Sequence, residues 1–297
     1  MTDRAHDEAR TRYEALCRSS LDEPEAFWLE AATRLDWTRP PDRALELREP
    51  PTFGWFPGGR TNLSVNALDR QVARGRGDVT ALIAIDERGA RRALTYRDLL
   101  AEVERVAAGL RGLGIAAGDR VTIYMPTSTE AIVAMLATVR IGAIHCVVFA
   151  GFGAGALGER IRASGSRLVL TTDVTYRKGK EVDLLTIVDD AIDAGPSEVE
   201  HVVVLRRRPT SRPPRGGELS WDELLGAGQG LAGGAADTGA EDPAFILATS
   251  GTTAKPKLAV HTHGGYGVHV ASMGDWVFGL RAGETWWSTS DIGWIVG

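Results

Sequence analysis

The sequence has 297 residues, of which 43% are hydrophobic and 25% charged, and its 34 basic and 39 acidic residues give a formal net charge of −5. A chain of this length and composition can bury its own core, which excludes global disorder, a collagen repeat and a coiled coil as its overall state. The acidic balance argues against a general binder of nucleic acid or of anionic membranes.

The cysteines and the start of the chain predict a cytoplasmic protein. Cys17 and Cys146 lie far apart and show no CxxC spacing, which fits a reducing compartment and supplies no metal or redox motif. The charged first residues lack the apolar segment of a signal peptide. The longest uncharged run, residues 141–158, contains five glycines. It therefore indicates a buried strand and a loop rather than a membrane helix.

Residues 1–60 favour helices over 8–21 and 25–35 and then become proline-rich. From residue 81, short apolar strands alternate with amphipathic helices. The expected strands are 81–85, 94–96, 121–125, 144–149 and 168–171, and the expected helices are 99–113, 129–141 and 156–163. Thr95 is a candidate N-cap for the first of these helices. The alternation predicts an α/β fold whose mostly parallel sheet is flanked by helices.

Residues 206–240 interrupt this alternation. Five arginines occur between residues 206 and 215, and Gly-rich sequence follows. The segment indicates a surface loop or linker around a short turn at residues 221–224. The arginines could bind nucleic acid, but no aromatic platform or folded basic face accompanies them. A solvated loop is therefore the favoured interpretation.

Residues 153–158 read Gly-Ala-Gly-Ala-Leu-Gly, a GxGxxG pattern. The pattern follows a predicted strand and begins a helix, and Asp173 stands 20 residues after Gly153. An NAD- or FAD-binding loop over Gly153–Gly158 is therefore an open alternative. Against it, the pattern follows at least the third strand rather than the first, and the helix is short. A Gly-rich loop that lets backbone segments pack closely is the favoured interpretation.

An apolar strand over residues 245–248 leads into a segment that suits a polyphosphate. Residues 249–257 read Thr-Ser-Gly-Thr-Thr-Ala-Lys-Pro-Lys, and a second strand is expected over 258–262. Hydroxyls and turn amides donate hydrogen bonds, and lysines add positive charge. The segment is not a GxxxxGK[ST] loop, because no Ser or Thr follows Lys257 and Pro256 prevents a helix from starting there. An ordinary polar hairpin turn remains the alternative.

His261, His263 and His269 form a weaker pattern. Alternate residues of a strand share a face, so the first two could ligate zinc together with the third. No cysteine or carboxylate completes a tetrahedral set nearby, and we therefore expect no metal site here.

The segment at 249–257 resembles the signature loop of the adenylate-forming (AMP-binding) enzymes, T-S-G-[ST]-T-G-x-P-K-G. Ala254 and Leu258 depart from it, since each replaces a glycine. Further segments are similar to the acetyl-CoA synthetase branch of this family, namely residues 62–70, 140–145, 166–191, 261–266 and 286–294. The resemblance implies an N-terminal cap over residues 1–75 and an AMP-binding domain over 76–297, incomplete at its carboxyl end.

The resemblance also implies an ATP-dependent acyl-CoA synthetase. Acetate or a similar short-chain carboxylate attacks the α-phosphate of Mg-ATP, pyrophosphate leaves, and the thiol of coenzyme A then attacks the acyl-adenylate. The implied ATP phosphate-binding residues are Thr249, Ser250, Gly251, Thr252, Thr253 and Lys257. The implied CoA-binding residues are Arg177, Lys178, Gly179, Lys180 and Val296, and those of the acyl pocket are Trp294, Ile295 and Val296. Lys180 stands where the family usually has arginine.

Members of this family are much longer. Their adenine-binding segment, ribose-binding aspartate, hinge and C-terminal domain with its catalytic lysine have no counterpart in these residues. We therefore expect an N-terminal fragment that is inactive alone and that acts on a small-molecule carboxylate. A separate polypeptide is a candidate for supplying the missing half. Nucleic acid and membranes are not expected partners.

Overall fold

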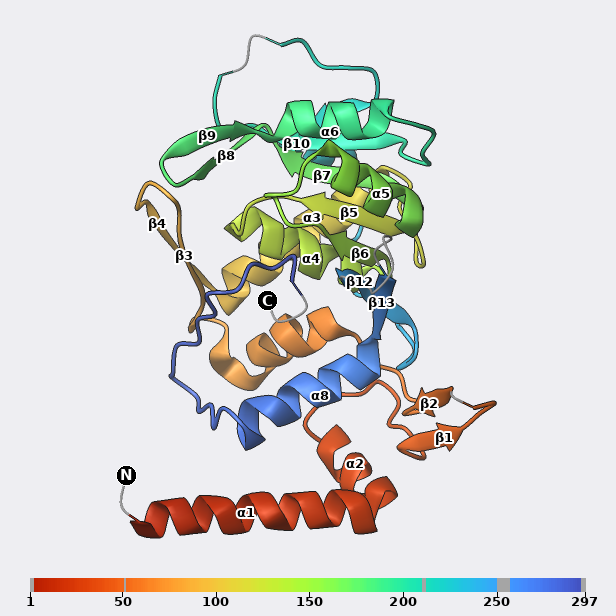
Figure 1. Ribbon diagram of the computed structural model, residues 1–297, viewed down its shortest axis with the longest axis vertical. Coiled ribbons are helices and arrows are strands. Elements are labelled where there is room, and N and C mark those ends of the chain that lie inside the picture. Colours follow the sequence, from red (N-terminus) through yellow and green to blue (C-terminus); the bar gives the residue numbers. More distant parts are fainter. Residues whose placement is uncertain (1–2, 51, 210–211, 250–256, 295–297) are drawn as a thin grey trace. The chain divides into compact units, whose positions relative to one another are not determined.

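The structure is a computed structural model and describes residues 3–50, 52–209, 212–249 and 257–294 (Figure 1). The chain packs as two compact units. Unit 1 consists of Met1–Thr61, Asp237–Asp242 and Thr262–Trp286, and unit 2 consists of Asn62–Ala236, Pro243–His261 and Trp287–Gly297. Unit 1 thus combines the start of the chain with two segments that follow it by about 180 residues or more.

Unit 1 is mainly helical. Its elements are α1 (Asp3–Asp22), α2 (Pro24–Ala32), the antiparallel pair β1 (Leu45–Leu47) and β2 (Phe53–Trp55), and α8 (His263–Trp276). Pro24 occupies the first turn of α2, where its missing N–H costs no helical hydrogen bond. The core of the unit joins distant segments, because Leu35 and Phe56 pack with Ala240 and Val268.

Unit 2 is built on a seven-stranded sheet with the strand order β11-β10-β7-β5-β6-β12-β13. In that order the strands are Glu218–Ser220, His201–Leu205, Ser166–Thr172, Arg120–Tyr124, Ile144–Val147, Pro243–Thr249 and Lys257–Thr262. The pairs from β11 to β12 are parallel, which confirms the expected α/β fold with a mostly parallel sheet.

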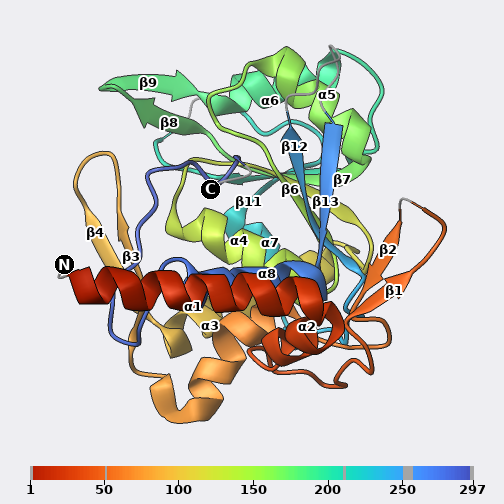
Figure 2. The ribbon, with the colours of Figure 1, turned by 60° about the horizontal axis from the view of Figure 1, so that its bottom comes forward.

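Helices cover both faces of this sheet (Figure 2). One face carries α5 (Ala154–Ser164) and α6 (Leu184–Asp193), and the other carries α3 (Tyr96–Gly112), α4 (Thr129–Arg140) and α7 (Trp221–Ala227). Ile144, Cys146 and Val148 point toward the α5–α6 face, as the two-residue period of a strand requires. The capping box of Thr95 with Asp98 starts α3, which confirms the predicted N-cap.

Smaller elements complete unit 2. Two π-helical turns, η1 (Val65–Asp69) and η2 (Val72–Arg76), precede two antiparallel hairpins, β3 (Thr80–Ile85) with β4 (Arg91–Thr95) and β8 (Val174–Arg177) with β9 (Lys180–Asp183). Among the described residues, no helix combines the length and the apolar character needed to cross a membrane.

Residues 206–240 are more ordered than the sequence suggested. Strand β11 joins the edge of the sheet, and α7 begins with a capping box between Ser220 and Glu223. Glycines of α3 explain how α7 packs there. A Cβ on Gly109 would lie 2.4 Å from the carbonyl oxygen of Leu224, and one on Gly112 would lie 2.0 Å from that of Ala227. The close approach of two helices therefore depends on residues far away in the sequence.

Candidate functional site

Four of the five residues predicted to bind CoA form the tip of the β8–β9 hairpin. Arg177 pairs with Lys180 across the two strands, and Lys178 and Gly179 form the turn between them. Both turn residues have positive φ, +51° and +75°, as a type I′ turn requires. Because directly paired residues of an antiparallel hairpin share one face, Arg177 and Lys180 present their charges together.

The Arg177 side chain lies over an aromatic ring that follows β6. Its guanidinium carbon is 4.8 Å from the ring centroid of Phe149, which is a cation–π contact. A Cβ added to Gly151 would lie 2.0 Å from a guanidinium nitrogen of Arg177, so the glycine leaves room for this arrangement. Arg177 nevertheless stays exposed, so its guanidinium edge remains accessible to a ligand.

Phe149 also contacts the residue predicted to line the acyl pocket. The ring centroid of Trp294 lies 5.6 Å from that of Phe149 and 5.9 Å from that of Phe152. Gly293 permits this packing, because a Cβ there would come within 2.6 Å of the Phe149 backbone nitrogen. Phe149 therefore bridges Arg177 and Trp294, two predicted site residues that are far apart in the sequence.

The sequence reasoning did not single out Phe149 or Phe152. A signal was available: both rings follow directly on the buried strand β6, at the carboxyl edge of the sheet. Ligands of open α/β sheets bind at that edge. The turn that holds Trp294 is fixed by Asp291, whose carboxylate accepts hydrogen bonds from the Gly293 amide at 2.8 Å and from the Thr127 hydroxyl at 3.4 Å.

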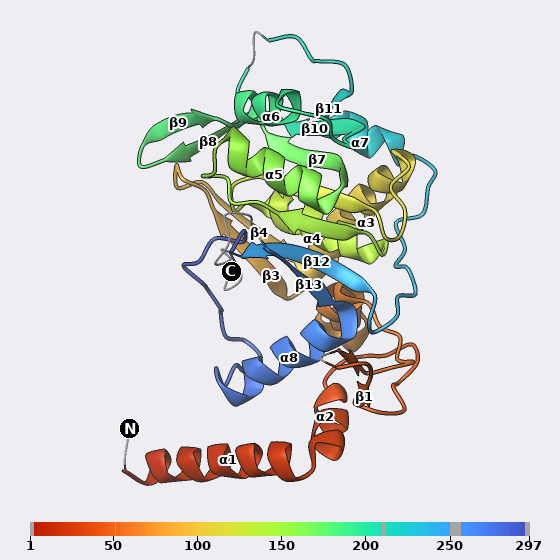
Figure 3. The same ribbon diagram turned by 45° about the vertical axis from the view of Figure 1, so that its right-hand side comes forward.

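Both ends of the predicted phosphate loop lie together. Strands β12 and β13 lie side by side (Figure 3). Thr249 ends β12 and Lys257 begins β13, and the Thr249 hydroxyl donates a hydrogen bond to the Lys257 carbonyl oxygen at 3.3 Å. β12 runs parallel to β6, so Thr249 lies at the same carboxyl edge as Phe149. The remaining predicted residues Ser250, Gly251, Thr252 and Thr253, together with Ile295 and Val296, lie outside the described residues.

The arginines of residues 206–215 all have carboxylate partners. The pairs are Arg206–Glu218, Arg207–Glu87, Arg208 with Glu181 and Asp183, Arg212 with Glu218 and Asp189, and Arg215 with Asp189 and Asp193. By contrast, Arg177, Lys178 and Lys180 form no ion pair with any residue that the structure describes. The cations at the hairpin tip are thus available to an anionic ligand, whereas the larger arginine group is already neutralised.

The dinucleotide alternative at Gly153–Gly158 is not supported. Gly153 is the N-cap of α5, and Gly158 allows helix packing, since a Cβ there would lie 2.9 Å from the Ala191 carbonyl oxygen. The Asp173 carboxylate is buried and accepts hydrogen bonds from the backbone amides of residues 174, 207 and 208 at 2.9, 2.8 and 3.3 Å. Asp173 therefore holds two chain segments together instead of facing a ribose.

The histidine pattern has a packing explanation. The His261 ring stacks on Phe245 at 4.4 Å between centroids, and burial lowers the pKa of His261. Burial also lowers the pKa of His263, to about 4, and this residue belongs to unit 1 whereas His261 belongs to unit 2. Within the described part of the chain, no group of three or more His, Cys, Asp or Glu side chains is placed to hold a metal ion.

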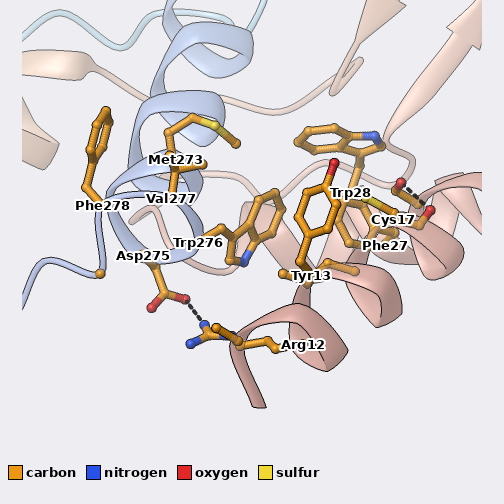
Figure 4. A pocket seen from close by; sticks show the side chains of 14 residues that line it. Arg12, Tyr13, Cys17, Phe27, Trp28, Met273, Asp275, Trp276, Val277 and Phe278 are labelled. Atoms are coloured by element: carbon orange, nitrogen blue, oxygen red, sulfur yellow. Dashed lines mark hydrogen bonds and ion pairs between the residues drawn. The ribbon is translucent and has the colours of Figure 1, made fainter. Parts of the chain in front are cut away.

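Unit 1 contains a separate cavity of about 450 Å³. It lies between α1, the start of α2 and the end of α8 and is lined by aromatic side chains that include Tyr13, Trp28 and Trp276 (Figure 4). An ion pair between Arg12 and Asp275, 3.3 Å long, lies at one side. None of the predicted site residues that the structure describes lines this cavity, so we do not include it in the candidate site.

Comparisons with known proteins show the family to which this chain belongs. A family model described as AMP-binding enzyme matches residues 68–297, and one described as acetyl-coenzyme A synthetase N-terminus matches residues 13–67. The chain belongs to the AMP-binding enzyme family. This membership confirms the relationship inferred from the loop at 249–257 and from the segments similar to acetyl-CoA synthetases.

The relatives of this chain are named as synthetases of different acyl-CoA products. An acetyl-coenzyme A synthetase of Deinococcus radiodurans is 45% identical over 97% of this chain and 44% of its own length. A 3-hydroxypropionyl-coenzyme A synthetase of Sulfurisphaera tokodaii is 43% identical over 96% of this chain and 44% of its own length. The solved acetoacetyl-CoA synthetase from Streptomyces lividans superposes with a TM-score of 0.85 at 29% identity, over 96% of this chain and 43% of that one. The chain therefore spans less than half the length of the relatives it matches.

Proposed function

We propose that this chain supplies the ATP- and CoA-binding parts of an ATP-dependent acyl-CoA synthetase. The observation that supports this most is the group of cations at Arg177–Lys180, which form no ion pair with a described residue, in a chain of the AMP-binding family. They lie at a tight turn, and Arg177 contacts the Phe149 ring. The printed names of the relatives include acetyl-, 3-hydroxypropionyl- and acetoacetyl-CoA synthetases. Acetate or a similar short-chain carboxylate is accordingly the proposed acyl substrate.

The loop at residues 249–257 is proposed to bind the β- and γ-phosphates of ATP. A carboxylate substrate attacks the α-phosphate, the acyl-adenylate forms and pyrophosphate leaves. Hydroxyls, turn amides and Lys257 then stabilise the charge that builds up on the leaving group. The adjacent strands β12 and β13 fix both ends of this loop, and the hydrogen bond from Thr249 to Lys257 joins them.

Magnesium is the proposed accompanying ion. The loop offers hydroxyl oxygens, from Thr249, Ser250, Thr252 and Thr253, beside the phosphate oxygens of ATP, and a set of oxygen ligands suits Mg²⁺. When bound, the ion offsets phosphate charge. The protein residues contribute the positioning of the phosphates and the positive charge of Lys257.

CoA is proposed to bind at the hairpin tip. The planar guanidinium of Arg177 can donate two parallel hydrogen bonds to a phosphate, whereas Lys180 supplies a point charge. The Phe149 ring covers one face of the Arg177 guanidinium, so the edge of the guanidinium is left to bind the ligand. Trp294, with Ile295 and Val296, is proposed to form the wall between the acyl pocket and the CoA channel.

The 297 residues alone are proposed not to complete acyl adenylation, because they span 44% of the full synthetases. Exchange of pyrophosphate into ATP with acetate tests this, with the D. radiodurans synthetase as positive control. We expect no exchange above background by the chain alone, and saturable ATP binding that Lys257→Gln weakens. Robust exchange by the isolated chain would show that it is competent. ATP binding insensitive to Lys257→Gln would contradict the assignment of the loop.

A further inference from the structure

The β8–β9 hairpin that carries Arg177 and Lys180 is not part of the seven-stranded sheet. It is a two-stranded sheet with four residues in each strand. An isolated hairpin of this size is at best marginally stable in water. A ligand site at its tip therefore needs other parts of the chain to hold the strands in place.

The turn between β3 and β4 makes direct contact with strand β8. Figure 1 shows the two hairpins projecting on the same side of unit 2. Glu87 lies in that turn, and one oxygen of its carboxylate accepts hydrogen bonds from the Thr175 hydroxyl at 3.2 Å and from the Tyr176 amide at 3.4 Å. The turn itself is fixed by Asp86, whose side chain accepts the amides of Arg88 and Ala90 at 2.9 and 2.8 Å. The Glu87 carboxylate is thus hydrogen-bonded to the strand that ends in the proposed CoA-binding tip.

Arg207 completes this arrangement. Its two terminal nitrogens donate to the two carboxylate oxygens of Glu87, at 3.1 and 2.9 Å, a bidentate ion pair. The hydrogen bond from Arg207 lowers the pKa of Glu87 to about 2, so the carboxylate stays ionised at neutral pH. The Tyr176 ring also contacts two guanidinium groups, with the Arg88 Cζ at 4.1 Å and the Arg207 Cζ at 5.7 Å from its centroid.

The second strand of the hairpin is held by the neighbouring arginine. Arg208 forms ion pairs with Glu181 and, at 3.3 Å, with Asp183, both in β9. Tyr176 links the two strands, because its hydroxyl donates a hydrogen bond to Glu181 at 3.1 Å. Both strands are therefore tied to the segment that follows β10, and Glu87 ties that same segment to the β3–β4 turn.

We propose that Glu87 is a positioning residue for CoA: together with Arg207 it fixes strand β8 so that Arg177 and Lys180 meet the CoA phosphates without a further ordering step. This inference rests on the proposed CoA-binding function. Ordering a site before the ligand arrives raises affinity, because less conformational entropy is lost on binding. Glu87 itself lies in the β3–β4 turn and acts through Arg207 and through its hydrogen bonds to strand β8.

Titration calorimetry of the whole chain with CoA, pantetheine and ATP tests this inference. Glu87→Gln keeps the size of the side chain and removes its charge. We expect the dissociation constant for CoA to rise about fivefold, as the loss of a bidentate ion pair outside the core would give. Binding of pantetheine, which has no phosphate, and of ATP should be unchanged.

Glu200→Gln is the matched control. Glu200 forms a bidentate pair with Arg167 at 3.0 and 2.8 Å in the same unit, but it does not contact the hairpin. The Glu200→Gln variant should leave CoA affinity within twofold of wild type. Arg207→Lys, which keeps the charge but loses the fork, should weaken CoA binding less than Glu87→Gln does. It also supplies a second variant if the first folds poorly.

The possible outcomes distinguish failure of this inference from failure of the proposed CoA-binding function. Unchanged CoA affinity in Glu87→Gln, while Arg177→Gln weakens binding, would overturn the positioning role and leave the CoA site standing. Equal losses for CoA, pantetheine and ATP would show a general structural role and would also overturn the inference. No CoA binding by the wild-type chain would refute the proposed function and this inference with it.

Discussion

Unit 2 contains two groups of basic residues that differ in whether they form ion pairs. Residues 206–215 carry five arginines, and every one is paired with a carboxylate. Residues 177–180 carry one arginine and two lysines, and none of the three forms an ion pair with a described residue. The first group is richer in arginine, yet only the second keeps positive charge that no described carboxylate neutralises.

In this comparison the availability of charge, rather than its density, separates the proposed CoA-binding group from the group whose arginines are all paired. Glu218 illustrates the structural case, because its side chain is 4% exposed and receives both Arg206 and Arg212. Such pairs connect β10, β11 and the loop between them. Arg177 instead contacts the face of the Phe149 ring, and no carboxylate that the structure describes forms an ion pair with it.

Arg177→Gln should produce the largest change in ligand binding. Loss of one charge-assisted, bidentate phosphate contact should raise the dissociation constant for CoA about tenfold or more. Calorimetric titration measures this, with pantetheine as the ligand that should not respond. An unchanged affinity for CoA would place its phosphates elsewhere and would remove the distinction between the two groups.

Arg206→Gln tests the paired group. It should lower the free energy of unfolding by about 1–2 kcal/mol, because the buried carboxylate of Glu218 loses one of its two cationic partners. CoA affinity should stay within twofold of wild type. Chemical denaturation and titration of the same preparation provide both numbers. A loss of CoA affinity without a loss of stability would mean that this group also serves the ligand.

Lys180→Arg should change CoA affinity by a smaller amount, and in the opposite direction to Arg177→Gln. The substitution keeps the charge and restores the planar fork that suits a phosphate, so CoA should bind about twofold to threefold more tightly. Lys178→Arg, at the positive-φ turn position, is the comparison variant and should give no such gain. Weaker binding by Lys180→Arg would indicate that the site is too narrow for a guanidinium at this position.

The Glu87–Arg207 pair predicts a small effect of pH. Arg207 holds the pKa of Glu87 near 2, below the usual value of 4.5. The pair therefore stabilises the folded state fully above about pH 4.5 and loses this contribution as the pH falls toward 2. Glu87→Gln should flatten this part of the curve of unfolding midpoint against pH. An identical pH dependence in the variant would show that the pair is not formed in solution.

Much of unit 2 follows from local sequence patterns. The alternation of apolar strands and amphipathic helices predicted its parallel sheet, and Thr95 marked the start of a helix, because periodicity and capping depend on neighbouring residues. The resemblance of residues 249–257 to a signature loop predicted the family.

Features that depend on contacts between residues distant in the sequence could not be predicted from local patterns. The partners of Arg206 and Arg208 lie in other elements, and the burial of α7 depends on Gly109 and Gly112 of α3. The GxGxxG pattern was ambiguous for the same reason, since the hydrogen bonds of Asp173 come from residues brought close by the strand order. The position of Phe149 in the candidate site depends on its contacts with Arg177 and Trp294, both distant in the sequence.

Parallel titrations of the wild-type chain with CoA, ATP and NADH test the central claim most directly. The account predicts saturable binding of CoA and of ATP and no binding of NADH. Saturable NADH binding that Gly155→Val abolishes, without binding of CoA or ATP, would contradict it and would make the Gly153–Gly158 loop the ligand site.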